Sequence, residues 1–502
     1  MVKVLPLLLP VSIACICAAY TCTGSPATGA DVKLASSDAE IPLAVLTATP
    51  ATGAAILHVT LDAGGSTVTG GSIARYEWDF DSDGTYDYDS GAVASANFFY
   101  YTPGTYTATL RVTSSAGATA TTSQDIVVSA GAGWEIQTAI AGRNITMADT
   151  FDVGGNPALV YVEKFEPSDW GEDSMRLLYR RATDDTGTSW MAEVELDRLV
   201  FLQQYTGFGL FSLNGAPAVI IGRHNVSSSG GQSYCYLTRA ADDTGTAWSE
   251  PERIGHGALV GLPIDVNGRA AMIGVQTAPP PFCSYSLSTD HNGETQDKPF
   301  SYGFKNSQGW YPSLQMVGGR PAISLHMKFE VPVPNAPPLG LCYLRANDEY
   351  GRQWPGDLTE VDLTIGGGPV HPDTHSHALV VTDTGPAIAY VDVGKQELRF
   401  VRANDANGDS WGDSEVLATG AGAVVATQLD GRPVLLYLNP AQTVAYFIAA
   451  NNAAGTSWGF PVAIENPEHV PHRLTVIGGN LAYCYCYSQD DGSSGVKLAT
   501  LR

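Results

Sequence analysis

The chain contains 502 residues, of which 51 are Asp or Glu and 27 are Lys or Arg, and its formal net charge is −24 at pH 7. Phosphate backbones and anionic membrane surfaces repel so acidic a chain, which excludes nucleic-acid binding and docking on anionic lipid as its main roles. The length predicts two or more domains. Short runs of Val, Thr and Tyr between Gly-rich turns, without sustained helical periodicity, predict an all-β protein.

The first 22 residues have the pattern of a secretory signal. Lys3 precedes a short apolar run followed by small residues, and the run is too short for a spanning helix. Cleavage is expected near Ala19. The stretch "SIAC" is similar to a bacterial lipoprotein box, although Ser12 stands where Leu is usual, so a lipid anchor on Cys15 is the alternative. Residues 23–42 are predicted to be a linker, and the mature chain, without a transmembrane segment, is expected to be secreted or held at the cell surface or in the periplasm.

The cysteines beyond the signal are expected to be free and buried. They are odd in number and stand in strand-like contexts, which does not suit a disulfide framework even in an exported chain. They are Cys235, Cys283, Cys342, Cys484 and Cys486.

Residues 43–130 contain short strands separated by turns, which predict a β-sandwich. Two stretches, "YEWDFDSDG" (76–84) and "YTPGTYTATLRV" (101–112), carry a specific resemblance. This segment resembles a PKD domain, because the first stretch matches the family's WDFGDG signature and the second matches its paired-strand pattern. The resemblance implies an Ig-like sandwich that serves as a spacer or binding accessory in extracellular proteins, and it implies no catalysis.

Acidic residues surround a Gly turn inside this segment. Asp79, Asp81 and Asp83 precede Gly84, and Asp87 follows it. Several carboxylates around a tight turn suit a hard cation, so calcium is the one cofactor that the sequence suggests. The alternative is that Asp79 bonds the sandwich backbone while the other carboxylates are solvated.

The remainder, residues 133–502, is built from repeats. A turn followed by an apolar strand, as in "LDGRPVLLYL" (429–438), alternates with an Asp-rich turn followed by Trp. The period of roughly fifty residues predicts the four-stranded blades of a propeller, and the copies predict seven blades. The last unit lacks its outer strand, and "GWEIQTAI" (133–140) supplies a matching strand at the other end of the region. An N-terminal strand is therefore expected to close the ring.

The Asp-rich turn "TDDTGTSW" (183–190) resembles the Asp-box, or BNR, repeat. The resemblance implies a hairpin between the outer strands of a blade, in which Asp accepts backbone N–H groups, Gly takes a positive φ and Trp packs between strands. Later copies place Glu349, Ala406 and Ala453 at the Asp position, and a catalytic acid would not tolerate that change, so the motif is predicted to be structural. Its expected residues are Asp185, Gly187, Trp190, Asp243, Gly245, Trp248, Gly351, Trp354, Gly408, Trp411, Gly455 and Trp458. As a whole, the region is similar to propeller repeats of secreted bacterial proteins.

One His-rich stretch, "VHPDTHSHALV" (370–380), is a candidate for ligand or metal binding. It lies in a connection between blades, where propellers place ligand sites around the channel mouth. The matching connections between other blades contain further His and Trp residues that could converge on the same site. The alternative interpretation is that these are scattered loop histidines without a shared function. The candidate ligand-binding residues are His375, His377, His472, His256 and Trp310.

The sequence favours an exported, non-catalytic binding or adhesion protein. Its propeller would present a face to an extracellular carbohydrate or a cell-surface protein, and the PKD-like sandwich would act as a spacer. No serine-hydrolase, zinc-protease or phosphate-loop motif is found. One alternative is a degenerate sialidase-like or other glycoside hydrolase or lyase that acts at the channel mouth, and another is a structural envelope component. A pair of close carboxylates at the channel would distinguish an enzyme from a binding protein.

Overall fold

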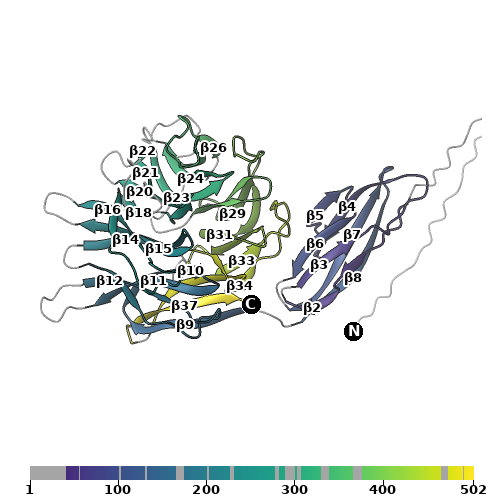
Figure 1. Cartoon of the computed structure of the whole chain (residues 1–502). Helices are drawn as coiled ribbons and strands as arrows, with labels where there is room; N and C mark the ends of the chain where they lie inside the picture. Colours follow the sequence, from purple (N-terminus) through teal and green to yellow (C-terminus); the bar gives the residue numbers. More distant parts are fainter. Residues whose placement is uncertain are drawn as a thin grey trace, which may run out of the picture.

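The computed structural model describes residues 41–502, apart from positions 56, 260, 364 and 490 and the segments 101–102, 130–132, 166–173, 200–202, 226–230, 277–281, 289–299, 302–306, 330–338, 366–375 and 465–472. The expected signal and most of the expected linker lie outside the described residues. Every element in the described part is a β-strand (Figure 1). None of these residues forms a helix of the length and apolarity needed to cross a membrane.

The N-terminal unit is a sandwich of two sheets (Figure 1). Its strands alternate inward apolar and outward polar residues, as in β3, where Leu57, Val59 and Leu61 are buried. Trp78 and Phe98 lie in the core between the sheets. One sheet pairs β1 (Thr47–Thr49), β3 (Leu57–Asp62) and β6 (Ser95–Tyr100), and the other pairs β2 (Thr52–Ala54), β8 (Thr119–Ser129), β7 (Gly104–Ser114), β4 (Ile73–Asp79) and β5 (Tyr88–Gly91).

The described remainder forms seven antiparallel sheets arranged as the blades of a propeller (Figure 1). Blade one has the order β10 (Ile145–Val153), β11 (Asn156–Phe165), β12 (Ser174–Arg181), β13 (Val194–Leu199). Blade two has the order β14 (Gln203–Leu213), β15 (Ala216–Asn225), β16 (Gln232–Arg239), β17 (Glu252–His256). Blade four has the order β23 (Ser307–Val317), β24 (Arg320–Phe329), β25 (Leu339–Arg345), β26 (Thr359–Asp362). Blade five has the order β27 (His377–Val381), β28 (Pro386–Asp392), β29 (Glu397–Arg402), β30 (Glu415–Thr419). Blade six has the order β31 (Ala423–Leu429), β32 (Arg432–Leu438), β33 (Ala445–Ala449), β34 (Val462–Ile464).

The other two blades depart from this pattern. In blade three the inner strand is split into β18 (Ala258–Leu259) and β19 (Ile264–Val266), which both pair with β20 (Arg269–Gln276), and β21 (Phe282–Leu287) and β22 (Phe300–Ser301) follow. In blade seven β35 (Thr475–Ile477), β36 (Asn480–Ser488) and β37 (Ser494–Leu501) are joined by β9 (Trp134–Arg143).

The ring is closed by its N-terminal strand, as the repeats predict. Strand β9 pairs antiparallel with β37, in a register that sets Trp134 opposite Leu501. Each inner strand contacts the inner strand of the next blade, and the last, β35, contacts β10 of the first. The middle strand of a blade packs on both faces, which is why β28 is buried along its whole length. The expected fold class, an Ig-like sandwich followed by a seven-bladed propeller, is therefore confirmed.

The Asp-rich turns are hairpins at the outer edge of the blades. In the first, the backbone N–H groups of Thr188 and Ser189 donate to Asp184 at 3.0 and 2.9 Å. Gly187 has φ +71° and its carbonyl accepts the indole N–H of Trp190 at 2.8 Å. The same indole-to-Gly bond is present at Trp248, Trp354, Trp411 and Trp458.

The predicted position of the acidic acceptor was wrong by one residue. Asp184 and Asp242 accept the turn's N–H groups, whereas Asp185 and Asp243 are exposed, and the Asp185 side chain faces Arg502. The two adjacent Asp residues of each turn made either alignment compatible with the pattern. With the corrected register the acceptor is kept in the later copies as Asp348, Asp405 and Asn452, so the expected loss at Glu349, Ala406 and Ala453 does not occur.

Neighbouring blades are held together through these turns. The hydroxyl of Tyr179 in blade one donates to the carbonyl of Thr244 in blade two at 2.9 Å, and the Tyr179 ring contacts Trp248. A Cβ on Gly245 would lie 2.5 Å from that ring, so both the positive φ and the close approach require Gly there. Tyr285 and Tyr343 make the same bond to the turns of the following blades.

The sandwich and the propeller contact each other at blade six. Phe460, which follows the Trp458 turn, packs against the sandwich core with its ring centroid 5.4 Å from that of Phe98. The Arg432 guanidinium lies 3.8 Å from the centroid of the Phe99 ring. All five cysteines expected to be free are free and buried.

Candidate ligand-binding site

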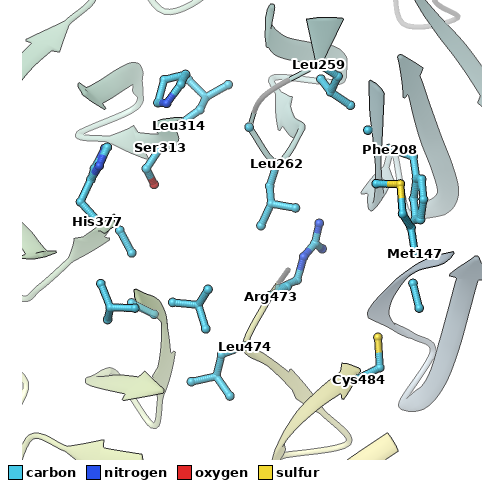
Figure 2. Close-up of a pocket in the computed structure, with 18 of the residues that line it drawn as sticks. Met147, Phe208, Leu259, Leu262, Ser313, Leu314, His377, Arg473, Leu474 and Cys484 are labelled. Carbon is cyan, nitrogen blue, oxygen red and sulfur yellow. The ribbon is translucent and has the colours of Figure 1, made fainter. Parts of the chain in front are cut away.

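A cavity of about 670 Å³ lies on the propeller axis (Figure 2). All seven blades contribute to it through their inner strands or the residues that enter them. Its wall combines apolar side chains, among them Met147, Phe208 and Leu314, with polar ones such as Thr206 and Gln442. Cavities of this size with both apolar and polar groups are typical of small-molecule sites.

Arg473 is the charged side chain of the described cavity wall. It stands just before β35, it is only 9% exposed, and its guanidinium points into the cavity (Figure 2). Its Nη2 lies 3.3 Å from Oδ2 of Asp149, within ion-pair distance but without hydrogen-bond geometry. Among the described residues, Nε and Nη2 of Arg473 have no hydrogen-bond partner. The guanidinium therefore keeps donors that the protein does not use.

Asp149 is fixed by the backbone of the first two blades. It is 1% exposed, and its carboxylate accepts the N–H of Leu210 at 3.0 Å and the N–H of Thr150 at 2.9 Å. Buried carboxylates require such donors because desolvation of an unpaired charge is costly. Asp149 thus neutralises part of the charge of Arg473 but is not among the residues that line the cavity.

Two buried imidazoles lie at the blade four to blade five side of the cavity. The rings of His326 and His377 are 4.6 Å apart between centroids, and His377 is the one that lines the cavity. Nε2 of His377 lies 3.1 Å from the carbonyl oxygen of Ser324, so Nε2 carries the proton and Nδ1 is left as an acceptor. Burial lowers the pKa of His377 to about 4 and lowers that of His326 well below its usual value. Both rings are therefore neutral at pH 7.

The five residues predicted to bind a ligand are not brought together in the described structure. His377 lines the cavity, but His256 lies on the outer strand β17, exposed, where its ring contacts Tyr234 and Arg253. Trp310 lies on β23 opposite His326 in the register, and its side chain is not described. His375 and His472 lie outside the described residues.

Sequence reasoning missed Arg473, Asp149 and His326. Arg473 directly follows His472, the residue of this connection that was predicted to bind a ligand. Asp149 sits inside an inner strand and meets Arg473 only because the ring closes the last blade against the first. Local patterns carry no information about a contact made by ring closure.

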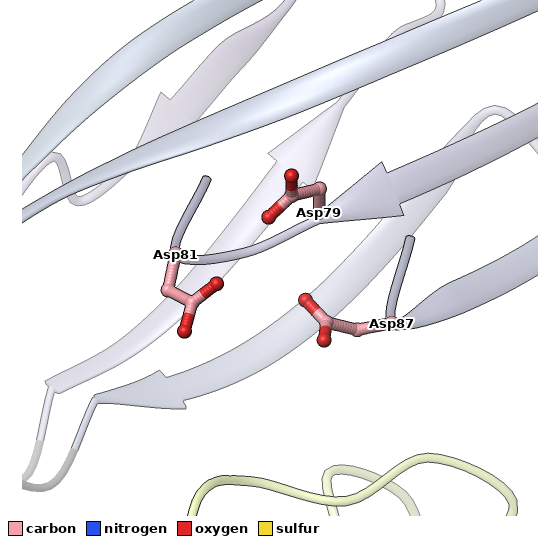
Figure 3. A group of neighbouring side chains, drawn as sticks. All are labelled: Asp79, Asp81 and Asp87. Carbon is pink, nitrogen blue, oxygen red and sulfur yellow. The ribbon is translucent and has the colours of Figure 1, made fainter. Parts of the chain in front are cut away.

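Three carboxylates converge at the Gly turn of the sandwich (Figure 3). Oxygens of Asp79, Asp81 and Asp87 lie within 4.8 Å of one another. Asp83 is not part of the group, because its carboxylate turns to the N–H of Thr85 at 2.7 Å. The predicted set of four is thus reduced to three.

The protonation and hydrogen bonds of these three carboxylates affect how well they can bind a cation. Partial burial of the carboxyl group and, to a smaller extent, the neighbouring Asp81 and Asp79 raise the pKa of Asp87 to about 6, although the residue as a whole is exposed. Burial likewise raises the pKa of Asp81. Asp79 accepts the N–H groups of Ser82 and Gly84 at 2.6 and 3.1 Å, as the alternative interpretation expected. Asp81 and Asp87 each accept one backbone N–H group, from Asp83 and Phe80, so all three carboxylates also serve the turn.

A comparison with protein-family models supports the identification of the N-terminal sandwich. Residues 39–128 match the family model of the PKD domain. No curated protein matches the chain in sequence.

Solved structures that resemble the chain include a Trypanosoma rangeli sialidase in complex with the inhibitor DANA, at 9% identity and a TM-score of 0.38, over 71% of this chain and 55% of the sialidase. A GH43_1 enzyme from Xanthomonas citri has 10% identity and a TM-score of 0.33, over 73% of this chain and 91% of the enzyme. A family 117 glycoside hydrolase from Zobellia galactanivorans has 9% identity and a TM-score of 0.33, over 60% of this chain and 84% of the hydrolase. At these values the neighbours do not bear on the activity of this chain, which spans about half the length of the sialidase.

Proposed function

We propose that the chain is an exported, non-catalytic binding or adhesion protein whose propeller holds an extracellular ligand in its axial cavity. The ligand class we favour is carbohydrate, with a cell-surface protein as the other candidate. The observation that carries the proposal is the composition of the cavity: a wall of mixed apolar and uncharged polar side chains around the buried guanidinium of Arg473 and the neutral imidazole of His377. Such a wall offers contact area and a few orienting polar groups, which is what a binding site requires.

The distribution of carboxylates supports binding over hydrolysis. Glycoside hydrolysis uses two carboxyl groups about 5 to 10 Å apart on either side of the scissile bond. The described cavity wall contains no Asp or Glu. Asp149, behind Arg473, is held by the N–H groups of Leu210 and Thr150, so it is committed to the fold.

Within this proposal the sandwich is an accessory that is docked on the propeller rather than a freely hanging spacer. The packing of Phe460 against the sandwich core and of Arg432 on Phe99 supports this arrangement. We also assign the propeller to the Asp-box-like repeats of secreted bacterial proteins, because the five turns keep the acceptor, Gly and Trp geometry. Export, through the signal predicted at residues 1–22, places the protein outside the cytoplasm.

Calcium binding by the sandwich is a second proposed role. The convergence of Asp79, Asp81 and Asp87 favours it, because a hard cation would bind several carboxylate oxygens and relieve their mutual repulsion. This role is compatible with the binding function, and it would also serve the alternative of a structural envelope component.

The test uses the mature chain, residues 23–502, on a panel of bacterial and plant polysaccharides with and without calcium. Retention and released sugar are measured in the same wells. We expect retention on at least one polysaccharide without release of sugar. Released sugar would replace the binding proposal with the glycoside hydrolase or lyase alternative. Calcium-dependent stability without retention on any glycan would favour a structural role or a protein partner.

A further inference from the structure

Arg473 is the one buried arginine among the described residues, and it is less well bonded than partly buried arginines such as Arg223 and Arg345. Arg223, for comparison, donates Nε and Nη2 to the two oxygens of Asp197 at 2.8 and 2.6 Å. Arg345 donates to the carbonyl oxygens of Val317 and Gly318 at 2.9 and 3.0 Å. Arg473 makes no such bonds in the described structure, and Nε and Nη2 remain without an acceptor.

A buried guanidinium whose donors lack acceptors is costly, and the nearby Asp149 carboxylate and Phe151 ring offset only part of that cost. Buried polar groups without hydrogen bonds destabilise the folded state, and the cost is larger for a charged group. Asp149 cannot meet the whole requirement, because its carboxylate already accepts two backbone N–H groups and its contact with Nη2 lacks hydrogen-bond geometry. The Arg473 side chain extends into the cavity (Figure 2), and its Nε and Nη2 atoms are themselves buried in the wall.

The chemistry of the missing partner follows from the shape of the donor. A guanidinium presents parallel N–H groups in a plane, and a carboxylate accepts them in pairs. The cavity, at about 670 Å³, is much larger than a carboxylate, and the residues described in its wall include no charged side chain other than Arg473. The partner is therefore a carboxylate on a larger, uncharged body, of the size that pockets of this volume hold.

We propose that Arg473 is the residue that selects a carboxylate-bearing ligand in the axial cavity, and that this ligand is a uronic acid unit of an extracellular polysaccharide. The inference rests on the proposed role of the cavity as the ligand site, and it names the chemical class that the site takes. Arg473 supplies the charged donors, and the uncharged remainder of the wall contacts the sugar body.

The experiment compares ligands that differ only in the carboxylate. Binding of galacturonate and glucuronate to the mature chain is measured by isothermal titration calorimetry against galactose and glucose. We expect at least one uronate to bind at least tenfold more tightly than its neutral parent. In the Arg473→Met variant this preference is lost, whereas the matched control Arg198→Met, which removes an exposed guanidinium from the outer strand β13, keeps it.

A second variant separates loss of ligand binding from loss of folding. Arg473→Lys keeps the charge but lacks the paired donors, and we expect it to retain less than a tenth of the wild-type uronate affinity at an unchanged thermal midpoint. Equal binding of the uronates and the neutral sugars by the wild type, or no binding of either uronate, would overturn the inference. Retention on neutral polysaccharides without a uronate preference would overturn this inference alone. Absence of both retention and uronate binding would remove the proposed function as well.

Discussion

Phe460 of blade six lies against Phe98 of the sandwich, with 5.4 Å between ring centroids. Phe98 is fully buried, and it belongs to the core that also contains Trp78. The propeller therefore completes one part of the sandwich core, and the two domains share an apolar contact. This relationship predicts that they behave as one body in solution.

Replacement of Phe460 tests this coupling. In the Phe460→Ser variant we expect the sandwich to detach from the propeller, because the apolar contact is replaced by a polar side chain that cannot fill the space. Small-angle X-ray scattering is expected to give a larger radius of gyration for the variant. The control Val416→Ser changes an exposed apolar residue of β30 and is expected to leave the scattering curve unchanged. Identical curves for Phe460→Ser and the wild type would contradict the docked arrangement.

The corrected turn register makes a prediction about two adjacent acids. Hydrogen bonds from Thr186, Thr188 and Ser189 outweigh partial burial and lower the pKa of Asp184, whereas Asp185 is exposed. We expect Asp184→Ala to destabilise the propeller by about 1 to 3 kcal/mol, because several N–H and hydroxyl donors lose their acceptor. Asp185→Ala is expected to change stability by less than about 0.5 kcal/mol. Chemical denaturation of both variants decides the register, and a larger effect at Asp185 would reverse the assignment.

The buried imidazole of His377 predicts a pH dependence of stability. Its folded-state pKa of about 4 lies below the unfolded value near 6.5, so the unfolded chain takes up a proton first as the pH falls. The stability tied to the neutral ring is complete above pH 6.5 and is lost between pH 6.5 and 4, with about 2 kcal/mol lost by pH 5.

The comparison that isolates this group uses His377→Gln, a neutral side chain that can still donate to the Ser324 carbonyl. We expect the wild type to lose about 2 kcal/mol more stability than the variant between pH 7.5 and 5. His326, whose pKa is also lowered, acts in the same direction in both proteins. The same pH dependence in wild type and variant would show that His377 is not held neutral by burial.

Calcium is expected to bind at the sandwich turn through Asp79, Asp81 and Asp87. Added calcium should raise the melting temperature of the wild type, and the Asp87→Asn variant should lose that rise. Asp83→Asn is the internal control, because the Asp83 carboxylate lies outside the converging group, and it should keep the rise. A wild-type melting temperature that does not respond to millimolar calcium would exclude the site.

The sequence predicts the fold well because the repeats are explicit. The strand pattern, the Gly and Trp of each turn and the displaced strand at residues 133–140 are local features, and they specify the blades and the closure of the ring through β9. The turn acid was misplaced by one position because Asp184 and Asp185 satisfy the pattern equally, and only the hydrogen bonds separate them.

The cavity could not be predicted in the same way. Arg473 meets Asp149 across the joint between the last and the first blade, and His377 meets His326 across the joint between blades four and five. These pairs are set by the order and number of the blades around the axis. His256 was expected in an equivalent connection, yet it is the last residue of the outer strand β17.

The central claim is that the ligand is held in the axial cavity, and obstruction of that cavity tests it most directly. Thr146 is an exposed residue of the cavity wall, so Thr146→Trp should obstruct part of the cavity without disturbing the core. Thr121→Trp, on the exposed face of β8 in the sandwich, is the matched control. Retention on the polysaccharide that binds the wild type is measured for both variants. The account predicts that Thr146→Trp loses retention and Thr121→Trp keeps it, and full retention of a folded Thr146→Trp variant would contradict it.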